Sequence, residues 1–275
     1  MRIPTLVILL LIGMPGLTQP NCAVYEGPCR KACEVYNRTE SVNQGTLVAH
    51  LSYDSAIALC PSFAHAHHEK SVAWLKNGEF LLWRRHMDEA VRLEPGMYLP
   101  NRGWCRFKFL RDYEGALTDL TEARRINRGF LGWSGDGDYD LELMVALCYR
   151  ELDQVDTAVA LMRDYFHRKE TDPNSLGVGI YDYLHFGATL FRRGDLTGAM
   201  NAFEKQIGVY KQLPDTYFYI AMIYKRQGNI EKYRENLNLA HSWFVKGYNR
   251  KDPYCEALDE IYLSDITKEL ESQEE

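Results

Sequence analysis

The sequence has no excess of positive charge and none of the short motifs that mark common active sites. Its 32 lysines and arginines are outnumbered by 38 aspartates and glutamates, so the formal net charge is -6. Nucleic acids and anionic membrane surfaces are bound by clustered lysine and arginine, so the composition favours neither ligand. The chain also lacks a glycine-rich phosphate loop, a G-x-S-x-G turn and an H-E-x-x-H helix. We therefore expect a protein that is not an enzyme, uses no cofactor and does not bind nucleic acid.

The apolar run at the start of the chain is too short to cross a membrane. It covers residues 6–12 and is followed by Gly13 and Pro15, whereas a membrane-spanning helix needs roughly 20 apolar residues. A single positive charge before a short apolar core is typical of a secretory signal peptide. We expect a signal peptide over residues 1–18, a mature chain that begins near Gln19, and no membrane span in that mature chain.

Four of the seven cysteines cluster near the predicted new N-terminus, at Cys22, Cys29, Cys33 and Cys60. In an oxidising compartment, disulfides can stabilise a short segment that has little core of its own. We expect one disulfide from Cys22 to either Cys29 or Cys33, in an exported protein of the periplasm or cell envelope. A lipid anchor on Cys22 is the alternative, although the residues before it do not match the leucine and the small residue of a lipoprotein signal.

A repeat with a period near 34 residues organises the chain. Residues 64–95 read AHAHHEKSVAWLKNGEFLLWRRHMDEAVRLEP. With Ala64 as position 1, the landmarks are a small residue at 8, aromatics at 11 and 17, glycine at 15, alanine at 27 and proline at 32: Ser71, Trp74, Phe80, Gly78, Ala90 and Pro95. Small residues let two helices approach closely, glycine ends the first helix and proline stops the second. The segment therefore predicts a helix-turn-helix unit.

This unit resembles the tetratricopeptide repeat, except that Trp83 stands at position 20, where a small residue is usual. Position 20 recurs along the chain at Ala49, Trp83, Ala116, Ala158, Ala199 and Tyr233. The resemblance is to exported bacterial proteins of this type. It implies an all-α, right-handed superhelical solenoid of about six helix-turn-helix repeats with a C-terminal capping helix.

The expected organisation follows from the repeat positions. After the signal peptide we expect a cysteine-containing segment with a degenerate first helix (19–45), repeats 1 to 3 (46–127), a Gly/Asp-rich insertion (128–138), repeats 4 to 6 with a loop at 169–179 (139–245), and a capping helix with an acidic tail (246–275).

A solenoid of this kind leaves an inner groove lined by the first helix of each repeat. The resemblance implies that the groove binds a protein or peptide segment. Position 12 or 13 is basic in repeats 2 to 6, at Lys76, Lys108, Arg150, Arg192, Lys225 and Arg226. Such a ridge would attract an acidic segment, but cations near a helix C-terminus also complement the helix dipole. Both explanations stay open. The other predicted groove residues are His65, His68, Tyr98, Asn101, Tyr181 and Phe218.

The sequence leaves two alternative functions open. The chain could be a structural component that uses its convex face and insertions, or a solenoid that binds metal or a small ligand. The sequence HAHH at 65–68 and the acids Asp136, Asp138 and Asp140 are the candidate ligands. The acids resemble the start of a calcium loop but lack its later glycine and glutamate. We expect no metal, because Asp138 or Asp140 can instead cap the next helix.

Overall fold

The computed structural model describes residues 19–39, 41–173, 175 and 177–272. The predicted signal peptide and the last three residues of the acidic tail lie outside this part of the chain. The described residues form helices, turns and irregular segments, with one isolated bridge between Trp133 and Asp140. They divide into two compact units at Leu93 and Glu94. We call them unit 1 (to residue 93) and unit 2 (from residue 94).

Unit 1 consists of two helical hairpins, whose helices are α1 (Gly27–Asn37), α2 (Leu47–Leu59), α3 (Ala64–Lys76) and α4 (Phe80–Leu93). The α2 helix starts where the Thr46 hydroxyl accepts a hydrogen bond from the Ala49 amide. Gly78 ends the first helix of the second hairpin with φ +77°, the left-handed conformation expected of glycine there. Trp83 is buried even though it replaces the usual small residue.

Two disulfides hold the start of unit 1. Cys22 bonds to Cys33 and thereby ties the N-terminal segment to α1, while Cys29 bonds to Cys60 and ties α1 to the end of α2. The first disulfide is one of the two pairings predicted from the sequence. The second was not predicted, because the pairing of Cys29 with Cys60 depends on how the hairpin folds back.

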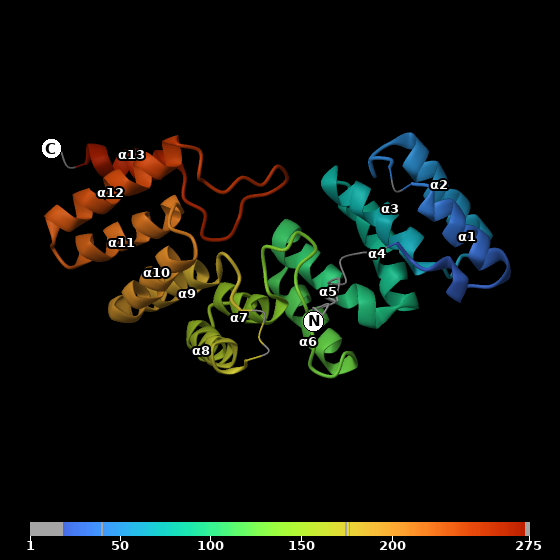
Figure 1. The fold of residues 1–275 in the computed structure, drawn as a ribbon, viewed down its shortest axis with the longest axis horizontal. Helices are drawn as coiled ribbons and strands as arrows, with labels where there is room; N and C mark the ends of the chain where they lie inside the picture. The colour runs from blue at the N-terminus through green and yellow to red at the C-terminus, as the bar shows by residue number, and fades with distance from the viewer. Residues whose placement is uncertain (1–18, 40, 174, 176, 273–275) are drawn as a thin grey trace, which may run out of the picture. The chain divides into compact units, whose positions relative to one another are not determined.

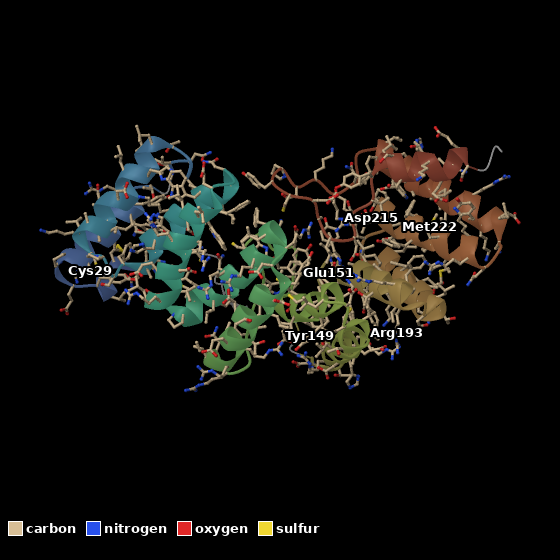
Figure 2. The ribbon with its side chains drawn as sticks, turned by 180° about the vertical axis from the view of Figure 1, so that it is seen from behind. Cys29, Tyr149, Glu151, Arg193, Asp215 and Met222 are labelled. Carbon is tan, nitrogen blue, oxygen red and sulfur yellow. A yellow bond between two sulfur atoms is a disulfide. The ribbon has the colours of Figure 1, made fainter. Side chains whose placement is uncertain are left out.

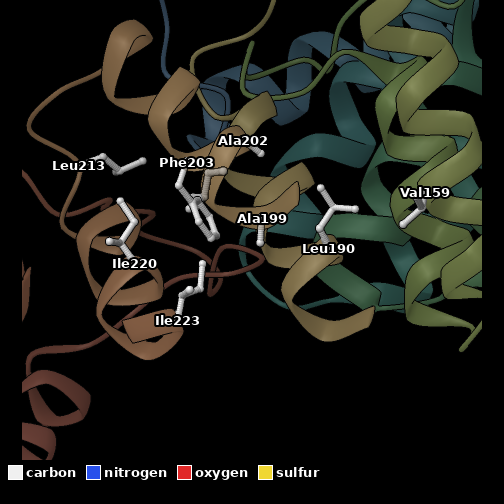
Figure 3. Packing of buried hydrophobic residues seen from close by; sticks show 9 residues of the cluster. Val159, Leu190, Ala199, Ala202, Phe203, Leu213, Ile220 and Ile223 are labelled. Atoms are coloured by element: carbon white, nitrogen blue, oxygen red, sulfur yellow. The ribbon is translucent and has the colours of Figure 1, made fainter. Parts of the chain in front are cut away.

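Unit 2 contains four hairpins and a final helix. Its helices are α5 (Pro95–Cys105), α6 (Tyr113–Ile126), α7 (Leu141–Glu151), α8 (Val155–Thr171), α9 (Asp182–Arg193), α10 (Leu196–Val209), α11 (Pro214–Arg226), α12 (Ile230–Val245) and α13 (Leu263–Glu271). A π-helical turn, η2 (Arg106–Leu110), extends α5. Figure 3 shows the core where Phe203 of α10 meets Ile220 and Ile223 of α11.

The segments between hairpins differ slightly from expectation. The α8 helix continues to Thr171, so the irregular segment predicted for 169–179 begins after that residue. The insertion before α7 is irregular, and it ends where the Asp140 carboxylate accepts a hydrogen bond from the Glu142 amide. No helix in the described part of the chain is both long enough and apolar enough to cross a membrane.

The C-terminal region departs most from the sequence prediction. The capping helix is limited to α13, whose Ile266 packs against α11 and α12. Residues 246–262, which we call the strap, are not helical, because Pro253 lacks an amide donor and the Asp252 carboxylate binds the amides of Tyr254 and Cys255 in a turn. In Figure 1 the strap leaves α12, runs towards α7 and α5, and returns to α13.

Candidate functional site

Five of the six basic residues that the repeat pattern singled out lie in unit 2, and the strap reaches the first two of them. Lys108 lies in η2 and is buried. Its ammonium contacts the carboxylates of Asp136 and Asp252, the second at 2.6 Å. Burial alone would lower the pKa of Lys108, but the hydrogen bonds to Asp136 and Asp252 raise it above its usual value. Lys108 is therefore a charged anchor for the strap.

Arg150, at the end of α7, is only 2 % exposed. Its guanidinium donates to Asp259 of the strap at 2.8 Å, to Glu151 at 2.8 Å and to Thr189 at 3.1 Å. Burial alone would raise the pKa of Asp259, but the Arg150 charge and the hydrogen bond with His185 lower it well below the usual carboxyl range. The acidic group that the buried cation binds thus belongs to the chain itself.

The His185 ring of α9 completes the seat of this carboxylate. Its Nδ1 lies 2.7 Å from the Asp259 carboxylate. Burial lowers the pKa of His185 in spite of this hydrogen bond, so the ring is neutral near pH 7 and donates from Nδ1. Asp259 therefore accepts one hydrogen bond from the charged Arg150 guanidinium and one from the neutral His185 ring, and these two donors belong to successive repeats.

A second buried ion pair fixes the base of the strap. Arg250 donates to Asp215 at the start of α11 at 2.9 Å and to the Leu258 carbonyl at 2.9 Å. Asp215 also accepts a hydrogen bond from the Ile261 amide at 3.0 Å. Both ends of the strap are therefore tied to the same carboxylate, which is labelled in Figure 2.

Beyond Asp259 the same face opens into a cavity of about 380 Å³, which we call the arginine pocket. It is lined by residues of α7, α9 and α11 together with one residue of the strap: Arg150, Glu151, Ala188, Phe191, Arg192, Tyr219, Arg226 and Asp259. Figure 2 labels Glu151, which stands at the end of α7. Three arginines face two carboxylates here, so the lining carries a net positive charge.

The two arginines that the strap does not touch are partly exposed. The Arg192 side chain is 42 % exposed and pairs with Glu151 at 3.4 Å and with Asp153 at 2.5 Å. The Arg226 guanidinium lies over the Phe191 ring, 3.8 Å from its centroid, which is a cation–π contact. The Tyr219 ring packs edge-on against Phe191 at 5.8 Å. The pocket thus combines accessible cations with an aromatic wall.

The predicted groove residues of unit 1 belong to a local network. His68 is buried and its Nδ1 lies 3.2 Å from the Glu69 carboxylate, while Lys76 donates to Gln44 at 3.3 Å. His65 packs against the rings of Tyr36 and Phe63. The lining of the arginine pocket includes none of these three residues.

The remaining predicted groove residues lie in unit 2 and have separate surroundings. Tyr98 is buried, Asn101 accepts a weak hydrogen bond from Cys105, and Tyr181 lies beneath the Arg250 guanidinium. Phe218 packs in the apolar cluster around Ile266, and Lys225 pairs with Glu269 of α13 at 2.5 Å. Of the predicted site residues, the structure therefore brings together Arg150, Arg192 and Arg226. The pattern had not indicated Tyr219 or the strap residue Asp259 as members of the site.

The acids considered as calcium ligands have partners within the protein. Asp136 pairs with Lys108, Asp138 lies 3.8 Å from the same ammonium, and Asp140 caps α7 and pairs with Lys169 at 2.8 Å. Burial raises the pKa of Asp138. Within the described ranges, no group of three histidine, cysteine or acidic side chains is arranged to hold a metal ion.

Comparison of the fold with solved structures gives several similar proteins, whereas no family profile and no curated protein matches the sequence. PilW, described as a type IV pilus biogenesis factor, aligns over 79% of this chain and 92% of its own with a TM-score of 0.59 and 17% identity. A tetratricopeptide repeat protein from Parabacteroides merdae aligns over 90% of this chain and 93% of its own, with a TM-score of 0.54 and 16% identity.

A third similar structure is YrrB, a tetratricopeptide protein described as having an unusual peptide-binding site. It aligns over 71% of this chain and 94% of its own, with a TM-score of 0.50 and 18% identity. At such identities the likeness concerns the fold. The chain is therefore an all-α solenoid of the tetratricopeptide type, as the repeat pattern predicted.

Proposed function

We propose that this protein is a non-catalytic scaffold that holds a protein or peptide segment in the arginine pocket of unit 2. The observation that carries the proposal is the convergence of Arg150, Arg192 and Arg226, from three successive repeats, around the rings of Phe191 and Tyr219. Arginine and aromatic side chains are enriched where proteins bind one another, because they offer hydrogen bonds and large contact areas at a modest entropic cost.

The strap supports the choice of this pocket over the rest of the same face. It occupies Lys108 and Arg150 with its own acids, so these buried cations are already neutralised. Arg192 pairs with Glu151 and Asp153 but is partly exposed, and Arg226 is exposed above the Phe191 ring. A partner can therefore reach Arg192 and Arg226, which lie beside Asp259 of the strap.

The proposed location is the periplasm or cell envelope. Two disulfides in unit 1 are compatible with folding in an oxidising compartment. The similar protein PilW is described as a type IV pilus biogenesis factor. Fractionation of the native cell, with detection of a chain that begins near Gln19, tests the proposal of export.

The test of the binding function is crosslinking in the native cell, followed by mass spectrometry. Arg192→Glu combined with Arg226→Glu is expected to lose the crosslinked partner, because the pocket then repels what it attracted. The matched control is Arg84→Glu with Arg125→Glu, which makes the same change of charge at two highly exposed side chains outside the pocket. Retention of the same partner by the pocket variant would show that this surface is not the binding site.

A further inference from the structure

Two histidines of unit 1 face each other across the second hairpin. His67 lies in α3 and His86 in α4, and their Nδ1 atoms are 3.4 Å apart. His67 belongs to the sequence HAHH, whereas His86 follows it by 19 residues and belongs to no motif found in the sequence. The His67 side chain is buried and the His86 side chain is half-buried, so solvent reaches this pair from the side of α4.

The second nitrogen of His67 fixes the tautomer of its ring. Its Nε2 lies 3.2 Å from the carbonyl oxygen of Pro61, which can only accept a hydrogen bond. Burial lowers the pKa of His67, so the ring is neutral near pH 7, with its proton on Nε2 and a lone pair on Nδ1. Histidines that bind a metal usually donate their other N–H to a carbonyl or a carboxylate in this way.

His86 presents a second neutral ring to that lone pair. Burial and the charge of Lys70 lower the pKa of His86 to about 4. In the free protein His86 donates its Nδ1 proton to His67, because the Nδ1 atom of His67 carries none. If the proton of His86 moves to Nε2, the two Nδ1 lone pairs face each other. The pair can then bind a metal ion without any net loss of protons.

The charged residues around the pair largely balance one another. Lys70 of α3 pairs with Asp54 of α2, and Arg92 pairs with Glu89 within α4 at 2.6 Å. Arg85 is exposed and also lowers the pKa of His86. A metal ion is therefore bound here through the imidazole nitrogens and not through an excess of negative charge.

The spacing of the two nitrogens matches that of two ligands on one zinc ion. Nitrogens that each lie about 2.0–2.1 Å from a tetrahedral zinc ion are about 3.3–3.4 Å from each other. The ring centroids are 5.7 Å apart, so the two nitrogens point almost directly at each other and both rings must tilt to aim at one ion. The last torsion of a histidine side chain is soft, so the rings can tilt while the helices stay in place.

We propose that His67 and His86 bind one zinc ion through their Nδ1 atoms, with water at its remaining positions, and that the ion links α3 to α4. Neutral imidazole is among the ligands that zinc prefers. In the described chain the disulfides hold the first hairpin, so zinc would give the second hairpin a crosslink of its own. The site belongs to unit 1, and the inference is independent of the proposed function.

Calorimetric titration of the full, disulfide-bonded chain with zinc chloride tests the proposal. We expect saturable binding of one zinc ion per chain, and His67→Gln and His86→Gln are each expected to weaken it at least tenfold, because glutamine supplies no imidazole nitrogen. The controls are His167→Gln, at an exposed histidine of α8, and Cys255→Ser, which removes a free thiol of the strap. Both control variants should bind zinc as the unchanged protein does.

Nitrogen NMR of the unchanged protein makes the test independent of whether a variant folds. We expect His67 to carry its proton on Nε2 before zinc is added, and the Nδ1 resonances of His67 and His86 to shift together as zinc binds. Three results would overturn the inference: no saturable binding, equal binding by the His67→Gln and His86→Gln variants, or zinc-dependent shifts confined to other histidines. Each would show that the pair is held by its own hydrogen bond alone.

Discussion

At the scale of single residues, small side chains decide how closely the two helices of a hairpin pack. Ala116, Ala158 and Ala199 stand at position 20 of three repeats and are fully buried. Gly187 of α9 stands at position 8, and a Cβ atom built on it would lie 2.4 Å from the Phe203 ring of α10. The ring fills the space that the missing side chain leaves.

Gly187→Ala is expected to destabilise unit 2 by about 1–3 kcal/mol, because the Phe203 ring or the helices must shift to make room. Equilibrium urea unfolding measures the change. The control is Gly208→Ala near the end of α10, where an added Cβ atom meets no atom within 4 Å. That substitution is expected to stabilise by up to about 1 kcal/mol, because alanine is the better helix former. A neutral Gly187→Ala variant would contradict the close packing.

The sequence predicted the recurring cations of this site but not their environments. Arg150 and Arg192 stand one position apart in their repeats, at 12 and 13, and one is buried whereas the other is partly exposed. The partner of the buried Arg150 is Asp259, which is separated from it by 109 residues. Helical periodicity describes contacts within and between neighbouring repeats, so a contact made by a returning segment leaves no trace in it.

At the scale of elements, the buried ion pair of Arg250 and Asp215 fixes the base of the strap. Arg250→Ala is expected to destabilise unit 2 by about 3–5 kcal/mol, because it leaves the Asp215 carboxylate buried without its cation. Hydrogen exchange followed by mass spectrometry should show faster exchange in residues 250–262, since the Arg250 contact to the Leu258 carbonyl is lost as well.

The adjacent exposed residue provides the control for this prediction. Lys251→Ala removes a cation from the same segment without touching Asp215, so its exchange should match that of the unchanged protein. Equal exchange in the Arg250→Ala variant would show that the strap is held mainly by Asp252 and Asp259.

The helices themselves were largely predictable, and the strap was not. Glycine at the turns and alanine at the crossings recur at fixed positions, so the helix-turn-helix units from Ala64 onwards follow from the repeat. The C-terminal segment has helical periodicity too, but α13 begins only at Leu263. Pro253 and the side chain of Asp252 stabilise a turn instead, and the buried partner Asp215 makes the extended path favourable.

At the scale of the whole molecule, the two units are stabilised in different ways. In the described chain the disulfides belong to unit 1, whereas Cys105, Cys148 and Cys255 of unit 2 are free thiols. The Cys29–Cys60 disulfide closes a loop of 31 residues between α1 and the end of α2. A crosslink of that kind limits the freedom of the unfolded chain.

Cys29→Ser combined with Cys60→Ser is expected to destabilise unit 1 by roughly 2–4 kcal/mol and to leave unit 2 unchanged. Urea unfolding followed by hydrogen exchange, resolved by peptide, separates the two units. Cys255→Ser, which removes a free thiol from the strap, should leave the stability of unit 1 as it was. Equal destabilisation of both units by the double variant would show that they unfold as one.

The strap also determines what a shortened form of this protein would do. A chain cut after Val245 would keep every hairpin of unit 2, but Lys108 and Arg150 would lose Asp252 and Asp259. This face would then be more basic, because each of the two cations loses one of its carboxylates, and its attraction for unrelated polyanions would rise. A truncated preparation that binds nucleic acid or heparin would therefore report on the missing C-terminus and not on the biological partner.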